Sequence, residues 1–194
     1  MINNYKKFNL KEITKENFSK EIPKVLELQE KVKESLKKLW KGDELFFTNT
    51  YEEFLKEVAY EPSKFIWIYN SKNDLCGYWL INKHMEYYRN KMIDLFIEDI
   101  SAQIDIIVID PDLWWKKLGS YILKNLENKY IELVPSTTTF LATVSPYNIS
   151  SLKLFIKNWY YINGLFKKHN KYYRVIVRKD LNINPNLKKK EKKL

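Results

Sequence analysis

Hydrophobic side chains recur at helical spacing in the first sixty residues. Between residues 19 and 39 they return every three or four positions, with lysine and glutamate between them. This period predicts an amphipathic helix that Asn17 or Ser19 can cap. A second helix is expected to begin near Thr50, which forms a capping-box pattern with Glu53, and to end before the next proline.

Two apolar runs rich in aromatic and β-branched residues follow, over 64–69 and 75–81. The polar stretch 70–74 between them is typical of a turn, so the pair is predicted to form a β-hairpin. Residues 84–103 carry apolar side chains at a spacing that fits one face of a helix, and we expect a third helix there.

Strands and helices alternate in the second half of the chain. The apolar pattern predicts, in order, a strand, a turn, a helix, a strand, a helix and two strands over 104–109, 110–112, 116–130, 137–144, 146–159, 160–166 and 171–177. Alternation in the middle, with an antiparallel pair at the end, predicts an α/β fold whose mixed central sheet is flanked by helices.

Length and composition fit one domain. The chain has 194 residues, of which 45% are hydrophobic and 15% aromatic, enough for one packed core. We expect a single domain over 1–181, followed by a basic, disordered tail over 182–194. The one cysteine, Cys76, cannot form a disulfide within the chain, and its apolar neighbours indicate a buried thiol.

Charge and histidine content narrow the possible partners. The formal net charge is +10, of which the five lysines and one glutamate of residues 188–194 contribute +4 and the rest of the chain +6. Because lysine is spread along the chain rather than gathered with aromatic residues in a recognisable module, nucleic acid is not favoured as a partner. His84 and His169 lack the spacing of a metal site, so no metal is expected.

The chain contains no segment typical of a signal peptide, and none approaches the ~20 apolar residues that a membrane helix needs. We therefore expect a cytoplasmic protein without membrane contact. The sequence does not distinguish between a monomer and a homodimer.

Two motifs in the second half resemble those of the GNAT acetyltransferase superfamily. The first motif has two parts: Ile109-Asp110-Pro111-Asp112 is similar to the Val-x-Pro-[Asp/Glu] that ends the family's fourth strand, and residues 118–123 are similar to the Ile-Gly-Ser-x-Leu-Leu that opens its third helix. Residues 148–160 resemble Asn-x-x-[Ala/Ser]-x-x-Leu-[Tyr/Phe]-x-Lys-Asn-Gly-Phe. The resemblance implies the GNAT fold, with a mixed sheet of about six to seven strands flanked by helices.

The resemblance also implies an enzyme that transfers the acetyl group of acetyl-CoA to a primary amine of a small molecule or peptide. In the family, free backbone groups of the fourth strand bind the pantetheine arm, as Ile107 and Ile109 would here. The unpaired N–H groups and positive dipole of a helix N-terminus suit the pyrophosphate. The other residues implied to bind the coenzyme are Trp114, Lys116, Lys117, Leu118, Gly119, Ser120, Asn148 and Ser151.

Acetyl transfer needs a base, because the amine must lose a proton. Asp105 falls where many family members carry a glutamate that acts as the base. Its carboxylate is either desolvated between two isoleucines, which would raise its pKa, or solvent-facing, and strand alternation allows both. Where many members have a tyrosine acid this chain has Phe155, so water would protonate the leaving thiolate.

The loop over 114–119 departs from the family's [Gln/Arg]-x-x-Gly-x-[Gly/Ala], of which only Gly119 matches. Lys117 stands at the usual glycine, where its Cβ would push a phosphate outward, although the ammonium groups of Lys116 and Lys117 can compensate. Alternatively, the two tryptophans before Lys116 fill the groove and the coenzyme site is lost. These departures leave open a non-catalytic module that binds acyl-CoA or a protein partner, and a nucleic-acid-associated protein acting through its basic tail.

Overall fold

The computed structural model describes residues 8–39, 45–46, 48–59, 64–82, 101–116, 118–168 and 172–181. Its elements in chain order are β1 (Asn9–Glu12), α1 (Lys15–Lys37), α2 (Tyr51–Ala59), β2 (Lys64–Tyr69), β3 (Leu75–Asn82), β4 (Ser101–Ile109), the 3₁₀-helix η3 (Pro111–Lys116), α4 (Leu118–Leu133), β5 (Thr139–Val144), α5 (Ile149–Lys157), β6 (Tyr161–Lys168) and β7 (Tyr172–Asp180).

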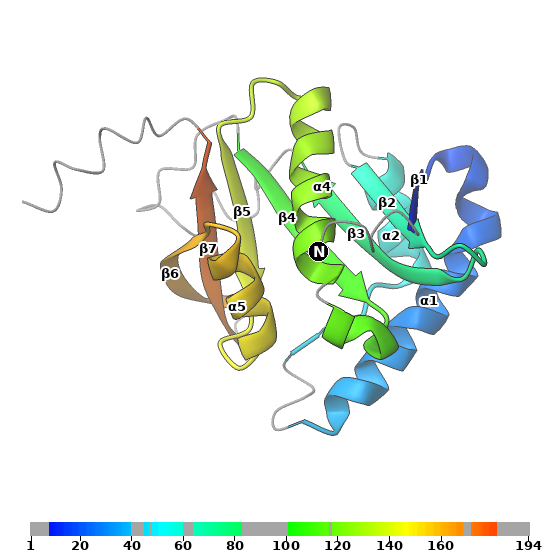
Figure 1. The fold of residues 1–194 in the computed structure, drawn as a ribbon, viewed down its shortest axis with the longest axis horizontal. Helices are drawn as coiled ribbons and strands as arrows, with labels where there is room; N and C mark the ends of the chain where they lie inside the picture. Colours follow the sequence, from blue (N-terminus) through cyan, green and yellow to red (C-terminus); the bar gives the residue numbers. More distant parts are fainter. Residues whose placement is uncertain are drawn as a thin grey trace, which may run out of the picture.

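Among the described residues, seven strands form one mixed sheet in the order β1-β2-β3-β4-β5-β7-β6. Neighbouring strands are antiparallel except β4 and β5, which are parallel. Helices α1 and α2 cover one face of the sheet and α4 and α5 the other (Figure 1). The predicted α/β fold with a mixed sheet of six to seven strands is confirmed.

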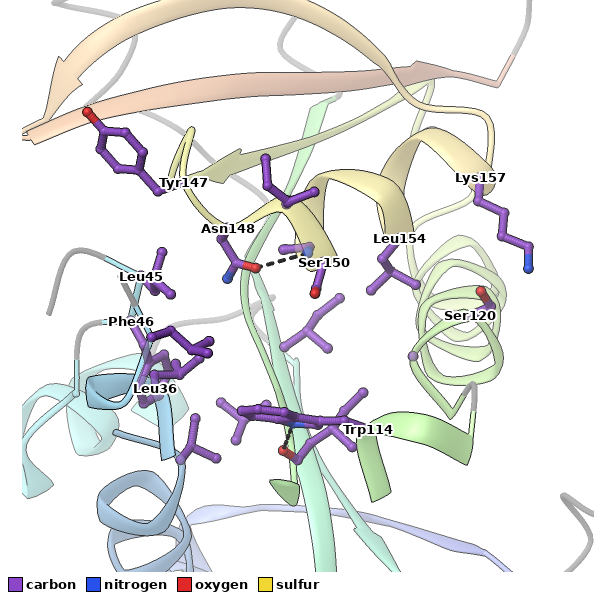
Figure 2. A pocket seen from close by; sticks show the side chains of 18 residues that line it. Leu36, Leu45, Phe46, Trp114, Ser120, Tyr147, Asn148, Ser150, Leu154 and Lys157 are labelled. Carbon is purple, nitrogen blue, oxygen red and sulfur yellow. Dashed lines mark hydrogen bonds between the residues drawn. The ribbon is translucent and has the colours of Figure 1, made fainter. Parts of the chain in front are cut away.

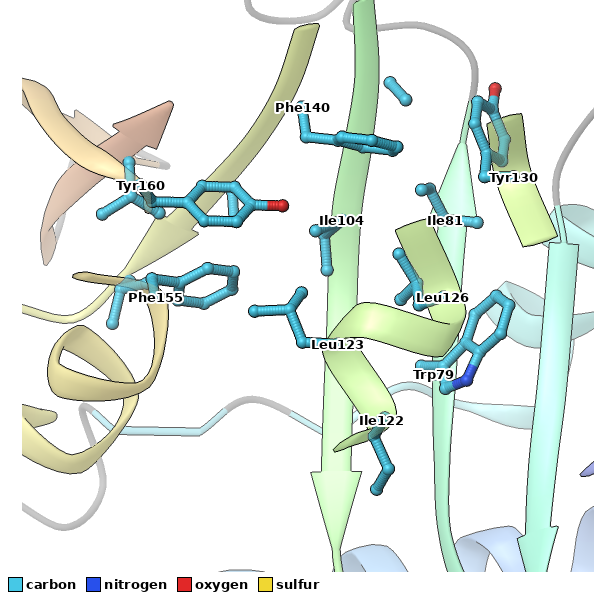
Figure 3. Close-up of a cluster of buried hydrophobic side chains, with 14 of the residues drawn as sticks. Trp79, Ile81, Ile104, Ile122, Leu123, Leu126, Tyr130, Phe140, Phe155 and Tyr160 are labelled. Carbon is cyan, nitrogen blue, oxygen red and sulfur yellow. The ribbon is translucent and has the colours of Figure 1, made fainter. Parts of the chain in front are cut away.

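Alternation along the strands gives each helical layer its own core. In β3, Trp79 and Ile81 pack under α4, while Tyr78 and Leu80 pack under α1, because neighbouring strand residues point to opposite faces. Figure 3 shows the cluster under α4. Trp79 Nε1 has no hydrogen-bond partner among the described residues, which costs about 1–3 kcal/mol. Burying an indole is worth roughly 4–6 kcal/mol, so burial outweighs the lost bond.

Helix α1 begins at Lys15, earlier than the apolar period predicts. Thr14 precedes the helix, and its backbone N–H donates to Asn17 Oδ1 at 3.0 Å. Thr14 is therefore the N-cap residue, and Asn17 lies in the first turn of the helix, where its side chain accepts the Thr14 N–H. The predicted start of α2 is confirmed: Glu53 N–H donates to Thr50 Oγ1 at 3.2 Å, and Thr50 N–H donates to Glu53 Oε2 at 2.8 Å.

The structure corrects the end of one predicted helix and adds one strand. β4 begins at Ser101, so the last three residues of the helix expected over 84–103 belong to a strand, and the others lie outside the described residues. β1 was not predicted, because four residues are too short to show a period. Cys76 is buried in β3, as predicted. The tail over 182–194 and both histidines lie outside the described residues.

A buried carboxylate joins β1, α1 and β2. Glu21 accepts hydrogen bonds from Lys11 Nζ at 3.1 Å, Lys24 Nζ at 3.1 Å and Tyr69 Oη at 2.9 Å. Burial alone would raise the pKa of Glu21, but these three donors outweigh it and lower the pKa from 4.5 to about 2. Glu21 therefore stays ionised and holds the short edge strand against the helix.

Within the described ranges, no helix is long and apolar enough to cross a membrane.

Candidate functional site

The sheet opens between its two parallel strands. Pairing of β4 with β5 stops at Ile104↔Ala142, while β4 continues beside β3 to Ile109. The register with β3 also skips Asp105, which marks a bulge at the point where the strands part. From this residue onward, one edge of β4 has no partner strand in the described part of the chain.

The open edge presents the peptide groups of Ile107 and Ile109. Asp110 N–H donates to the carbonyl of Cys76 in β3 at 2.8 Å. Since peptide groups alternate in direction along a strand, those of Ile107 and Ile109 point away from β3, toward the gap. Both residues were predicted to bind the coenzyme in this way. The Ile109 carbonyl is already engaged, because Trp114 Nε1 donates to it at 2.8 Å.

A cavity of about 500 Å³ lies beside this edge, between α1, η3 and the first turns of α4 and α5 (Figure 2). Seven of the ten predicted coenzyme-binding residues line it: Ile107, Ile109, Trp114, Gly119, Ser120, Asn148 and Ser151. The Leu118 side chain is buried in the core, so this residue can contribute only through its backbone. Lys117 and the side chain of Lys116 lie outside the described residues.

Helices α4 and α5 meet closely at one end of the cavity. A Cβ on Gly119 would lie 3.1 Å from Leu154 Cδ1 and 3.2 Å from Leu154 Cδ2, so the glycine lets the two helices approach. Asn158 Nδ2 then donates to Ser120 Oγ at 3.1 Å and to the Leu154 carbonyl at 2.7 Å. These residues of the two motifs hold the first turn of α4 against α5.

The start of α5 forms another wall of the cavity. Asn148 caps this helix, because its Oδ1 accepts from the Ser151 N–H at 3.0 Å. One of the amides that the helix leaves without an internal partner is thereby satisfied within the protein. Figure 2 shows Leu154 and Lys157 further along the same helix, with Lys157 and Ser120 toward one end of the cavity and Leu36 and Phe46 toward the other.

Trp114 lines the cavity without closing it. Its indole is 44% exposed and lies beside β4, where Nε1 bonds to the strand (Figure 2). The hypothesis that tryptophans fill the groove therefore does not hold for Trp114. The side chain of Trp115 lies outside the described residues.

Two carboxylates of the Val-x-Pro-[Asp/Glu]-like motif anchor α1. Lys31 Nζ lies 2.8 Å from Asp110 Oδ1 and 2.7 Å from Asp112 Oδ2, and these hydrogen bonds raise the pKa of Lys31. The ion pairs tie the helix to the turn after β4. They keep the α1 wall beside the open edge of the strand.

Gln29 holds a further segment of the wall. This side chain is 1% exposed; its Oε1 accepts from the Asn49 N–H at 2.8 Å and its Nε2 donates to the Asn49 carbonyl at 3.0 Å. Leu45 and Phe46, close before Asn49 in the chain, line the cavity. In the sequence, the signal for this clamp is a glutamine that stands at an apolar position of the helical period.

A second cavity of about 180 Å³ adjoins the first and shares five of its lining residues, Leu45, Phe46, Ile107, Asn148 and Ser151. The predicted base, Asp105, lines it. The residue is half-buried, so its carboxylate is neither fully desolvated nor fully solvent-facing, the two alternatives that strand alternation allowed. Its Oδ1 accepts from Gln103 Nε2 at 3.0 Å. Arg174 lines the same cavity and was not predicted, because its burial depends on how β7 packs beside β5.

The tyrosines near Phe155 differ in what they contact. Tyr160 Oη donates to Glu127 Oε1 at 2.8 Å in the core, and burial together with that carboxylate raises the pKa of Tyr160 well above its usual range. Burial and the hydrogen bond to Asp180 raise the pKa of Tyr161 to about 12. Neither ring is placed to act as an acid at the cavities. Among the described tyrosines, Tyr147 lines the larger cavity, and none lines the smaller one.

Phe155 itself is buried and packs edge-to-face on Tyr160, with ring centroids 4.9 Å apart. In the described part of the chain, no three or more His, Cys, Asp or Glu side chains gather where they could hold a metal ion.

Comparisons with known proteins agree on the fold. A GNAT-family acetyltransferase from Listeria monocytogenes has a TM-score of 0.67 at 14% identity, over 90% of this chain and 95% of that one. The ribosomal-protein-S18-alanine N-acetyltransferase from Escherichia coli has a TM-score of 0.63 at 10% identity, over 91% and 97%. The yncA protein from Salmonella typhimurium, solved with its cofactor acetyl-CoA, has a TM-score of 0.60 at 12% identity, over 92% and 96%.

At these identities the solved structures show a shared fold. No curated protein matches the chain in sequence. The model of the acetyltransferase (GNAT) family, however, matches residues 27–158, more than half of the chain. This match runs from within α1 to the end of α5 and includes the open edge of β4, the first motif and residues 148–158 of the second. The chain therefore belongs to the acetyltransferase (GNAT) family.

Proposed function

We propose that this protein transfers the acetyl group of acetyl-CoA to a primary amine. The observation that carries the proposal is the open edge of β4, which borders a cavity large enough for a ligand arm. An extended chain with amide groups can bond to such an edge as an added strand would. The peptide group of Ile107 faces it, and the Trp114 indole marks where the edge ends.

The lining fits the two chemical parts of a coenzyme. Leu36, Phe46 and Leu154 give the cavity an apolar surface for the arm. Gly119 and Ser120 lie in the first turn of α4, whose N–H groups and dipole favour phosphate. Among the described residues, Lys157 is the one charged side chain that lines this cavity, and it can pair with a phosphate group.

Acetyl-CoA supplies an activated acetyl thioester. We place the acceptor in the smaller cavity, where Asp105 takes a proton from the acceptor ammonium directly or through water. The amine nitrogen then bonds to the acetyl carbonyl carbon and loses its second proton to solvent, and the carbon–sulfur bond breaks. Because Phe155 has no proton to give, solvent protonates the thiolate.

A non-catalytic module that binds acyl-CoA is the second candidate, and Phe155 is the observation that favours it. Both candidates require coenzyme binding at the same cavity. They differ in whether thioester is consumed when an amine is present. The expected single domain over 1–181 would hold the whole site in either case.

Charge reversal in α5 tests the site. Lys157 and Lys153 are exposed on this helix, but only Lys157 lines the cavity. We expect Lys157→Glu to weaken coenzyme A binding by about fivefold to thirtyfold in calorimetry, the range of one charge-assisted hydrogen bond. Lys153→Glu should remain within about twofold of the unmodified protein, because its charge lies in solvent.

Thioester loss from acetyl-CoA against pooled primary amines separates the two candidates. Turnover that Asp105→Asn lowers about a hundredfold or more supports the enzyme, since a base typically contributes that much. Coenzyme binding without turnover of any amine would leave the acyl-CoA-binding module. Absence of coenzyme A binding would refute both.

A further inference from the structure

Four apolar side chains at one edge of the sheet are more than half exposed. Ile156 of α5 is 51% exposed, and on β6 and β7 Ile162 is 59%, Leu165 61% and Tyr173 55% exposed. We propose that these four residues, the β6 patch, form a homodimer interface in which β6 pairs with β6 of a second copy of the chain. This inference is independent of the proposed function.

The edge that β6 presents can accept another strand. β6 is last in the order β1-β2-β3-β4-β5-β7-β6, so it pairs with β7 on one side and has no strand on the other among the described residues (Figure 1). The outward-facing backbone groups of such an edge form a template for pairing, which charged side chains and prolines usually prevent. β6 has eight residues and no proline, and Lys167 is the charged one among its described side chains.

The strand residues of the β6 patch share the face of the sheet on which α4 and α5 lie. Ile162 pairs with Val177 and Leu165 with Val175, and both valines belong to the core on that face. Paired residues of neighbouring strands point to the same face, so Ile162 and Leu165 point to it as well. Tyr173 follows on this face, because it lies two residues before Val175. Helix α5 leaves these three side chains uncovered.

Ile156 extends the patch onto α5. Leu154 of this helix faces Gly119 of α4, and Phe155 is buried against the core. Successive residues of a helix are about 100° apart, so Ile156 points to the side away from α4. The strands on that side are β7 and β6. The exposed isoleucine of the helix and the exposed side chains of the outer strands therefore border the same edge of the molecule.

A two-fold axis perpendicular to the sheet brings two such edges together. The two β6 strands are then antiparallel, and both copies keep their α5 face on the same side of the joined sheet, so the two patches meet. Side chains that lie opposite each other across the axis must share a face. Placing Leu165 opposite itself meets this condition and puts the more exposed of the two β6 patch residues at the centre of the interface.

Charge does not oppose this pairing. With Leu165 at the axis, Lys167 of one copy lies opposite the neutral Asn163 of the other, so like charges are not placed opposite each other. Two basic residues of the neighbouring strand β7 are paired inside the chain, Arg178 with Asp180 and Lys179 with Glu127.

The area is sufficient for a specific contact. A fully exposed apolar or aromatic side chain presents about 100–200 Å², so the four residues offer roughly 300 Å² in each copy. A strand edge of eight residues adds a strip of about 27 by 10 Å, or roughly 270 Å². The two copies together would bury about 1,100–1,200 Å², which reaches the lower end of stable protein interfaces.

The mass in solution tests the interface. Sedimentation equilibrium at micromolar concentration should give twice the 23.5 kDa of one chain. Leu165→Glu places two carboxylates opposite each other and should raise the dimer dissociation constant by roughly tenfold or more. Leu133→Glu is the matched control, because Leu133 is 52% exposed at the end of α4, outside the patch, and its dimer should be unchanged.

Three results would overturn the inference. One is a monomer at every concentration. Another is a Leu165→Glu protein that dimerises as tightly as the Leu133→Glu protein. The third is a monomer that binds vesicles of anionic phospholipid and loses this binding in Leu165→Glu, which would assign the patch to a membrane surface.

Cross-linking places the axis and does not depend on whether the charged variant folds. In a Cys76→Ala background, Leu165→Cys should give a disulfide-linked dimer on mild oxidation, because residues directly opposite in an antiparallel pair have Cβ atoms about 4.5–5.5 Å apart. Leu133→Cys should stay uncoupled under the same conditions. Equal cross-linking of both variants, or none of Leu165→Cys, would contradict the assignment. None of the four patch residues lines either cavity, so its failure leaves the proposed function standing.

Discussion

The turn that closes helix α5 contains a residue, Trp159, whose backbone conformation is unfavourable for a residue with a side chain. Trp159 has φ of 73°, in the left-handed region. Its N–H donates to the Ile156 carbonyl at 3.1 Å, and the Tyr160 N–H donates to the Phe155 carbonyl at 3.1 Å. These two bonds form a Schellman motif, in which glycine is the usual residue at this position. The family pattern that the chain resembles also has glycine there.

Trp159→Gly is therefore expected to stabilise the protein. A left-handed conformation costs a side-chain-bearing residue roughly 1–2 kcal/mol, and the greater freedom of glycine in the unfolded chain offsets about 0.5–1 kcal/mol of the gain. The indole is 84% exposed, so its removal loses little burial. The net gain is about 0.5–1 kcal/mol, or a rise in Tm of about 1–4 °C for a chain of this length.

Thermal unfolding followed by circular dichroism, together with urea denaturation, measures the effect. Trp159→Ala is the control, because it removes the indole but keeps the Cβ and the strained φ. We expect no gain for Trp159→Ala and an intermediate one for Trp159→Asn, which tolerates this region better. A Trp159→Gly protein no more stable than Trp159→Ala would refute the argument from backbone strain.

Three further changes follow from single contacts. Gln29→Leu should lower Tm and raise KM for both substrates, because the Asn49 backbone loses two hydrogen bonds that are together worth about 1–3 kcal/mol. Unchanged KM values would show that the positions of Leu45 and Phe46 do not depend on the bonds between Gln29 and Asn49. Gly77→Ala places a Cβ 2.5 Å from the Val108 carbonyl oxygen, so β4 must shift. Urea denaturation should show a free energy of unfolding lower by about 1–3 kcal/mol. An unchanged free energy of unfolding would contradict the close approach of β3 and β4 at this glycine. The pKa of Glu21 is lowered from 4.5 to about 2 on folding, so its contribution is present above pH 4.5 and is lost as the pH falls toward 2. Since its lysine partners are about half exposed, that contribution is about 1–2 kcal/mol, and Glu21→Gln should flatten this part of the stability profile measured in urea.

Elements with strong local signals were predictable from the sequence. The Thr50 and Glu53 capping box begins α2, and the apolar runs around residues 70–74 form the β2–β3 hairpin, because capping and turn chemistry act over a few residues. The start of α1 was missed since polar residues of its first turn carry no apolar period. β1 was missed because a four-residue strand depends on its partner, not on its own pattern.

The site could be predicted only where it lies in the motifs. Ile107, Gly119, Asn148 and Ser151 line the larger cavity as the resemblance implied. Arg174 could not be assigned from the sequence, because its place depends on the pairing of β7 beside β5 and on the gap between β4 and β5. The role of Trp114 also needed the structure, since only the folded chain brings its indole to the end of β4.

Amide hydrogen exchange of β4 tests the central claim most directly, because it reports whether a coenzyme bonds to the open strand edge. On addition of coenzyme A, exchange at the Ile107 N–H should slow markedly, whereas the Val108 N–H, which faces β3, should change little. Coenzyme A that binds without protecting Ile107 would contradict the account.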